Sequence, residues 1–191
     1  YGQMFLNLER TSPKQFNGVA GVALAGLSFL KSEAMRACVS QSTFSLHELK
    51  TAARGMSLYV CLPQRYLETH FGWLRMIVSL ITAEMERLKQ PSATGHRLLM
   101  ILDEFPALKR MRVIENAAAQ IAGFGVKLVL VAQSLAQLKD HYKDNWEALV
   151  GSCGAKLFFC NDDHFTREYV SKLIGECEVV RTSVNHSATM G

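Results

Sequence analysis

Two adjacent carboxylates, Asp103 and Glu104, follow directly after the apolar run Leu98–Leu102. A run of about four to eight apolar residues bounded by polar ones is typical of a strand covered on both faces, as in a parallel sheet. In α/β proteins the carboxyl ends of such strands form the rim where ligands bind. The aspartate could hold a magnesium ion, directly or through water, and the glutamate could orient or deprotonate an attacking water.

This arrangement is that of a Walker B motif in P-loop nucleotide hydrolases. A strand that simply stops at a solvated acidic turn would give the same residues, so the Asp-Glu pair alone leaves both readings open. Its interpretation depends on what else reaches the same edge of the sheet.

Gln133 is the second candidate, because it ends the apolar run Val126–Ala132, one helix further along the chain. The ends of consecutive strands in a right-handed crossover can be neighbours or lie one strand apart. A glutamine at such an end can hydrogen-bond a γ-phosphate or the attacking water and so report whether nucleotide is present. The structural alternative is a helix-capping glutamine beside Ser134.

From Gly55 onward the sequence alternates between strands and helices. The apolar runs predict four strands, at residues 56–62, 98–102, 126–132 and 155–160. The first two are separated by a helix whose apolar residues, spaced three and four apart, form one stripe from Leu67 to Leu88. This alternation predicts an α/β fold with a parallel or mostly parallel sheet and helices on both faces. We expect the strand ends at Pro63, Asp103, Gln133 and Asn161 to line one edge.

The first part of the chain differs in composition and pattern. Residues 11 to about 53 are rich in Ala, Leu and Met, and Pro13 stands where a helix could begin. No strand is predicted there. We therefore expect two parts, a helical segment at residues 1–53 and an α/β part at residues 54–191.

Composition sets the limits of the prediction. A chain of 191 residues with 49% hydrophobic residues can bury a sizeable core, and a net charge of +4 is too small to indicate a polyanionic partner by itself. The five cysteines are scattered without metal-ligand spacing, and Cys61 and Cys160 fall in predicted strands, where we expect them to be buried. This predicts a reducing, cytosolic compartment. The longest uncharged run, residues 16–30, is shorter than the roughly 20 residues of a membrane span, so no span is expected in this fragment.

Three stretches, residues 98–108, 117–142 and 145–175, carry a family resemblance. Their succession Leu-Asp-Glu-Phe…Ala-Gln-Ser-Leu-x-Gln-Leu resembles the TraG/VirD coupling proteins of type IV secretion and conjugation, which are RecA-like ATPases related to the FtsK/HerA DNA pumps. The resemblance implies a RecA-like P-loop NTPase fold that uses ATP and Mg²⁺. It implies that Asp103 is the magnesium-side carboxylate, Glu104 the catalytic base and Gln133 the sensor glutamine.

The same resemblance implies a setting and partners. The full-length protein would be a membrane-anchored homo-hexamer at the cytoplasmic face of the bacterial inner membrane. It would receive DNA with its relaxase, or effector proteins, and pass them to the components of the secretion channel. Residues 1–53 would belong to the family's all-α domain, which recognises the substrate.

The sequence departs from the family pattern in two places. It contains no GxxxxGK[ST] motif, so the loop that cradles the phosphates is missing, and we expect this fragment alone to bind nucleotide weakly or not at all. Some branches carry an arginine finger three residues before the glycine matched by Gly125, where this sequence has Ala122. Another arginine could supply that charge, or the branch could work without one.

Two other functions remain open. The chain could be a non-hydrolysing module that docks a relaxase or effector through residues 1–50, or a HerA-like DNA-processing ATPase that is soluble. The basic cluster Lys109, Arg110 and Arg112 is either a solvated helix start, a contact for DNA phosphates or a source of the missing finger. The mixture of aromatic and charged residues from His141 to Trp146 suits either single-stranded nucleic acid or a join between helices.

Overall fold

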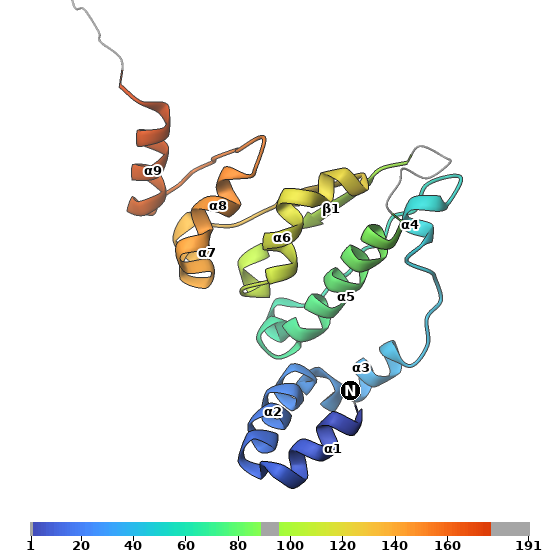
Figure 1. The fold of residues 1–191 in the computed structure, drawn as a ribbon. Coiled ribbons are helices and arrows are strands. Elements are labelled where there is room, and N and C mark those ends of the chain that lie inside the picture. Colours follow the sequence, from blue (N-terminus) through green and yellow to red (C-terminus); the bar gives the residue numbers. More distant parts are fainter. Residues whose placement is uncertain (1, 89–95, 177–191) are drawn as a thin grey trace, which may run out of the picture.

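The computed structural model describes residues 2–88 and 96–176, with the side chains of residues 117–120 excepted. Within that part the fold is mixed α/β, with many helices around a small parallel sheet (Figure 1). The helices of residues 2–39 form a lobe at one end, and the helices that follow the sheet lie at the other (Figure 1).

The N-terminal elements are helical throughout. Their bounds are α1 (Gly2–Thr11), α2 (Pro13–Gly26), η1 (Ser28–Lys31), α3 (Glu33–Val39) and α4 (Glu48–Thr51), where η denotes a 3-10 helix. The predicted start at Pro13 is confirmed, since the fixed φ of proline suits the first turn of a helix. The division of the chain at residue 53 stays a prediction.

The remaining elements alternate as far as the sheet and are helical beyond it. They are η2 (Gln64–Tyr66), α5 (Leu67–Leu88), β1 (Leu98–Leu102), η3 (Phe105–Leu108), α6 (Arg112–Gln120), η4 (Ile121–Phe124), β2 (Val126–Leu130), α7 (Leu135–Tyr142), η5 (Lys143–Asn145), α8 (Trp146–Gly151) and α9 (His164–Ile174). The 3-10 helix η5 separates α7 from α8, and Gly175, with a φ of 78°, ends α9.

The sheet consists of β1 and β2, paired in parallel with Leu98 opposite Val126 and Leu102 opposite Leu130. The predicted strands at residues 56–62 and 155–160 are wrong for the described part of the chain, where neither forms a ladder. A strand is stable only when another strand satisfies its backbone groups, and the apolar pattern of a segment does not supply that partner.

Helices cover only one face of this sheet. Met100 and Leu102 are buried, whereas the alternate side chains Leu99 and Ile101 are 55% and 59% exposed. The prediction of helices on both faces is therefore wrong for the described residues. Since Cys61 and Cys160 lie in the two segments without a ladder, they are exposed, and the prediction that they are buried is also wrong.

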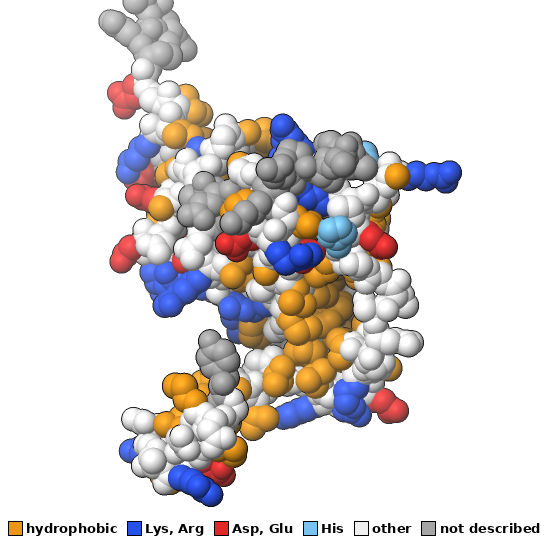
Figure 2. Space-filling model, turned by 45° about the vertical axis from the view of Figure 1, so that its right-hand side comes forward, with side chains coloured by type: hydrophobic (Ala, Val, Ile, Leu, Met, Phe, Trp, Pro, Cys, Tyr) orange, Lys and Arg blue, Asp and Glu red, His pale blue; other side chains and the backbone are white. Residues whose placement is uncertain are grey.

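The core lies under the covered face. The predicted stripe of α5 is confirmed, because Val78, Ile81 and Met85 are buried and pack with residues of β1, η3, α6 and α7. Burial of such side chains is worth about 1.5–3 kcal/mol each, so α5 is held chiefly by this face. Figure 2 shows a further hydrophobic area, between the lower helical lobe and the upper part of the molecule.

Among the contacts that attach the N-terminal helices to the rest, two involve tightly packed or buried residues. A Cβ added at Gly72 of α5 would lie 2.6 Å from the carbonyl oxygen of Gly26, so the end of α2 crosses α5 where only glycine fits. Lys50 of α4 is 1% exposed, and its Nζ donates to the carbonyl oxygen of Phe124, 2.7 Å away. Burial lowers the pKa of Lys50.

Candidate functional site

The paired strands carry the predicted site residues to one edge. Parallel pairing continues beyond the strand ends: Val131 N–H donates to Leu102 O at 3.0 Å, and Phe105 N–H donates to Val131 O at 2.8 Å. The backbone on either side of Glu104 is thereby fixed against the segment that leads to Gln133. The sequence left open whether the two strands are neighbours or lie one strand apart. In the structure β1 and β2 are direct neighbours.

Gln133 and Glu104 are in direct contact. The amide Nε2 of Gln133 donates to Oε2 of Glu104 at 2.8 Å. An ionised carboxylate can only accept hydrogen bonds, so the amide occupies one of its oxygens and leaves the other for a further donor such as water. The helix-capping alternative for Gln133 is wrong, because the hydroxyl of Ser134 accepts from Gln137 N–H at 3.3 Å and caps α7.

The turn that holds the two carboxylates has a special backbone. Glu104 lies in the left-handed region, with φ 50° and ψ 46°, and its N–H donates to Oδ1 of Asp103 at 3.0 Å. Residues held in this region cost roughly 1–3 kcal/mol and cluster at functional sites. Here the turn presents the Asp103 carboxylate to solvent while Glu104 is half-buried against Gln133.

The carboxylates fit a magnesium ion of the kind that keeps most of its waters. Mg²⁺ binds through one or two carboxylates together with waters and substrate phosphates. Asp103 is exposed, and its Oδ2 accepts no hydrogen bond from a described residue. The described residues offer no cluster of three or more His, Cys, Asp or Glu, so a metal held by protein ligands alone does not fit.

The 3-10 helix η3 anchors this turn to the core. Phe105 is fully buried and its ring stacks on that of Tyr142, with centroids 5.6 Å apart. The Tyr142 hydroxyl accepts from Met111 N–H at 3.2 Å and donates to Lys109 O at 3.4 Å. Burial raises the pKa of Tyr142, which keeps the hydroxyl protonated as a donor.

The aromatic residues after Gln133 belong to the core. Tyr142 is fully buried, and Trp146, 6% exposed, meets Phe165 and Tyr169 edge-on with centroids 5.3 and 5.4 Å apart. Neither ring is available to stack on a base. The interpretation as a join between helices is therefore correct, and the nucleic-acid interpretation of these two residues is wrong.

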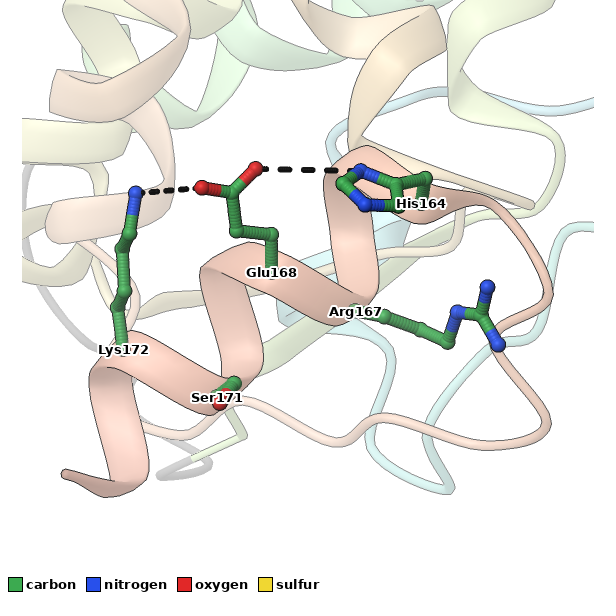
Figure 3. Close-up of a pocket in the computed structure, with 5 residues that line it drawn as sticks. All are labelled: His164, Arg167, Glu168, Ser171 and Lys172. Carbon is green, nitrogen blue, oxygen red and sulfur yellow. Dashed lines mark hydrogen bonds and ion pairs between the residues drawn. The ribbon is translucent and has the colours of Figure 1, made fainter. Parts of the chain in front are cut away.

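The acidic residues before α9 act as a helix cap. Asp163 accepts from Thr166 N–H at 2.8 Å. The hydrogen bonds from Thr166 lower the pKa of Asp163. His164 lies 3.9 Å from Glu168, and with Lys172 they line a shallow depression of about 450 Å³ along α9 (Figure 3). All the lining side chains come from this one helix, so the depression contains none of the site residues.

Two residues that support the site were not identified from the sequence. Arg75 of α5 donates from one guanidinium nitrogen to Leu108 O at 2.7 Å and to Arg110 O at 2.9 Å. Thr166 of α9 is 1% exposed, and its Oγ1 accepts from Leu135 N–H at 3.0 Å. Nothing in the sequence near Arg75 or Thr166 indicates these partners, which lie about 30 residues away in the chain.

Comparisons with known proteins agree on one group. The family model "Type IV secretory system Conjugative DNA transfer" matches residues 3–191. The chain is 28% identical to protein VirD4 of Rhizobium radiobacter over 163 residues, which are 85% of the chain and 23% of VirD4. It is 25% identical over 182 residues to conjugal transfer protein TraG of Escherichia coli, covering 91% of the chain and 29% of TraG.

A probable conjugal transfer protein TraG of Sinorhizobium fredii is 30% identical over 179 residues, which are 92% of the chain and 27% of that protein. The chain thus spans about a quarter of the length of these relatives. No solved structure gave a significant match. In the described part of the chain, no helix has both the length and the apolar composition needed to cross a membrane.

Proposed function

Since the chain belongs to the family of type IV secretory system conjugative DNA transfer proteins, we propose that it forms part of an ATP-driven coupling protein. In this proposal the natural full-length protein has a RecA-like domain that hydrolyses ATP. The contact between Gln133 and Glu104, 2.8 Å long and adjacent to Asp103, carries the proposal. It joins a carboxylate pair and an amide at the ends of two parallel strands, where α/β proteins bind ligands.

Each site residue has a separate role. The exposed Asp103 carboxylate faces the metal side and holds a metal-bound water or the ion itself. Glu104 accepts the proton of the attacking water through the oxygen that Gln133 leaves open. Gln133 holds Glu104 in place and, by exchanging this partner for a phosphate oxygen, distinguishes occupied from empty sites.

The cofactor would be ATP with Mg²⁺, and the ion would neutralise charge on the phosphate oxygens. The chain itself supplies only the carboxylate and glutamine side of such a site, because it has no GxxxxGK[ST] motif. A segment that cradles the phosphates must come from elsewhere in the full-length protein.

The partners follow from the family. We propose that the full-length protein is a hexamer at the cytoplasmic face of the inner membrane, which receives DNA with its relaxase, or effector proteins, and passes them to the secretion channel. The N-terminal helices α1 to α3 stand apart from the sheet (Figure 1), which supports a role for residues 1–53 in cargo recognition. This leaves residues 54–191 as the distal part of the nucleotide-binding domain.

A second candidate is a docking module that binds relaxase or effector without hydrolysis. It is favoured by the position of α1 to α3, which stand apart from the sheet (Figure 1). It gives no reason for the strained turn at Glu104 and its contact with Gln133, which is why we place it second.

The test is ATP hydrolysis by the full-length protein, with and without DNA, for wild type and Glu104→Gln. We expect Glu104→Gln to bind ATP and to lose turnover by at least about a hundredfold, since it keeps the shape of the side chain and removes the base. Glu86→Gln, at an exposed position on α5, is the matched control and should retain turnover. Equal turnover of Glu104→Gln and wild type would reject the hydrolytic role and leave the docking module.

A further inference from the structure

A second polar site lies near the C-terminal end of η3, whereas Glu104 precedes the N-terminal end of this helix. A pocket of about 320 Å³ is lined by Arg75 and Ser79 of α5 and by residues 110–113, which precede and begin α6. Three of its lining side chains are arginines: Arg75, Arg110 and Arg112. Arg75 and Arg110, on the two walls, are 35 positions apart in the sequence, so only the fold brings these charges together.

The charge of the pocket is largely uncompensated. Glu115 occupies the guanidinium fork of Arg110, accepting from Nε at 2.9 Å and from Nη2 at 3.3 Å. In the described part of the chain, this is the carboxylate that forms an ion pair with a pocket arginine. Three guanidinium groups against one carboxylate leave two positive charges. Burying or concentrating cations without anions is unfavourable, and a bound anion removes that cost.

The pocket is also rigid. Arg75 holds its loop by the carbonyl oxygens of Leu108 and Arg110, at 2.7 and 2.9 Å. From the opposite side, the buried Tyr142 hydroxyl bonds to Met111 N–H and Lys109 O. These contacts hold the backbone on both sides of Arg110, while the exposed guanidinium of Arg112 makes no hydrogen bond to a described residue and keeps its donors for a ligand.

Arginine and serine donors in such a pocket suit phosphate. The guanidinium group offers several N–H donors in a planar fork that matches phosphate oxygens. Lys109 extends the positive surface beside the pocket, with its Nζ 4.3 Å from the centroid of the Phe71 ring. A row of cations on an open face fits a phosphodiester backbone, which presents one negative charge after another.

We propose that the pocket of Arg75, Arg110 and Arg112 binds phosphate groups of a nucleic-acid backbone. The choice of DNA as the ligand rests on the proposed function. Because η3 connects Glu104 directly to Leu108, whose carbonyl Arg75 holds, the pocket is joined to the carboxylate site by one short element.

The experiment measures binding of the whole chain to a fluorescein-labelled single strand and to the matching duplex, by fluorescence anisotropy over a salt series. The first variant is Arg112→Ala, since Arg112 is exposed and none of the described hydrogen bonds depends on it. We expect affinity at low salt to fall about fivefold to tenfold and the salt slope to decrease by about one. Arg112→Lys keeps the charge without the fork and should lie between wild type and Arg112→Ala.

Arg167→Ala is the matched control, because it removes an exposed arginine from α9, outside the pocket. If Arg167→Ala lost as much affinity for DNA as Arg112→Ala, the assignment of the pocket as the binding site would be wrong, and the proposed function would be unaffected. Titration with a fluorescent ATP analogue forms a second arm. If Arg112→Ala weakened binding of the analogue and kept DNA binding, the pocket would be a nucleotide contact and the inference would be wrong. Absence of DNA binding by the wild-type chain would overturn the pocket too, whereas the hydrolytic role depends separately on Glu104→Gln.

Discussion

Thr166 accepts a hydrogen bond from the backbone N–H of Leu135, at 3.0 Å and out of contact with solvent. Leu135 is the first residue of α7 and follows Gln133 by two positions. The first N–H groups of a helix have no partner within the helix, so a side chain on α9 satisfies one of them. The last part of the structure thereby fixes the segment that presents Gln133.

Replacement of Thr166 by valine should therefore destabilise the protein. The change keeps the shape of the side chain and leaves the Leu135 N–H without a partner, which costs about 1–3 kcal/mol in free energy of unfolding. Urea denaturation of Thr166→Val beside Thr166→Ser measures this difference. The serine variant retains the hydroxyl, so a loss as large in Thr166→Ser would attribute the effect to packing.

The cap at Asp163 should make the stability of α9 depend on pH. Its pKa is lowered in the folded state, so its contribution is complete above the unfolded pKa of about 3.9 and disappears as the pH falls through the folded value. Asp163→Ala should cost about 1 kcal/mol at neutral pH and much less in acid. Thermal unfolding of wild type and Asp163→Ala, from neutral pH into acid, measures this difference in stability. Asp163→Asn, which caps without titrating, should show a flatter profile than wild type, and a parallel profile would contradict the assignment.

Tyr142 should be more sensitive to loss of its hydroxyl than an exposed tyrosine. Tyr142→Phe leaves Met111 N–H and Lys109 O without their partner, and we expect a loss of about 1–3 kcal/mol. Tyr66→Phe, at a position 41% exposed, should change stability by less than about 0.5 kcal/mol. Chemical denaturation with both variants distinguishes a buried structural hydroxyl from a surface one.

The strained backbone at Lys109 predicts an unusual order of stability. Its φ of 55° and ψ of −165° fall in a region that is nearly restricted to glycine. Lys109→Ala keeps the strain and loses the contact with Phe71, whereas Lys109→Gly relieves the strain. We expect the glycine variant to be more stable than the alanine variant by about 1 kcal/mol. The opposite order in thermal denaturation would show that this backbone conformation is not strained in solution.

The parts of the fold that the sequence predicted are those set by local pattern. The stripe of α5, the start of α2 at Pro13 and the two paired strands depend on spacing and on residue type, which are visible in the chain. The strand at residues 155–160 has the same apolar composition but no neighbour to pair with in the described structure. Pairing is a long-range property, so apolar pattern overestimated the sheet.

In the site, too, features set by local pattern could be predicted and long-range contacts could not. Asp103, Glu104 and Gln133 were selected because each ends an apolar run, and the parallel pairing of those runs brings Glu104 and Gln133 into contact. The supporting contacts of Arg75 and Tyr142 could not be predicted, since their partners are backbone groups distant in sequence. A carbonyl oxygen or an N–H group is present at almost every residue, so no residue type marks it in advance.

The buried ammonium group of Lys50 has a consequence for how the molecule opens. Separating α4 from η4, which precedes β2, would break the hydrogen bond between Lys50 and the Phe124 carbonyl, at a cost of about 1.5–3 kcal/mol. Local openings that break this contact are correspondingly rare, so α4 and the start of β2 should exchange their amide hydrogens as one cooperative unit. Helix α4 and the segment that leads into β2 are thus linked by a direct contact, although 74 positions separate Lys50 from Phe124 in the sequence.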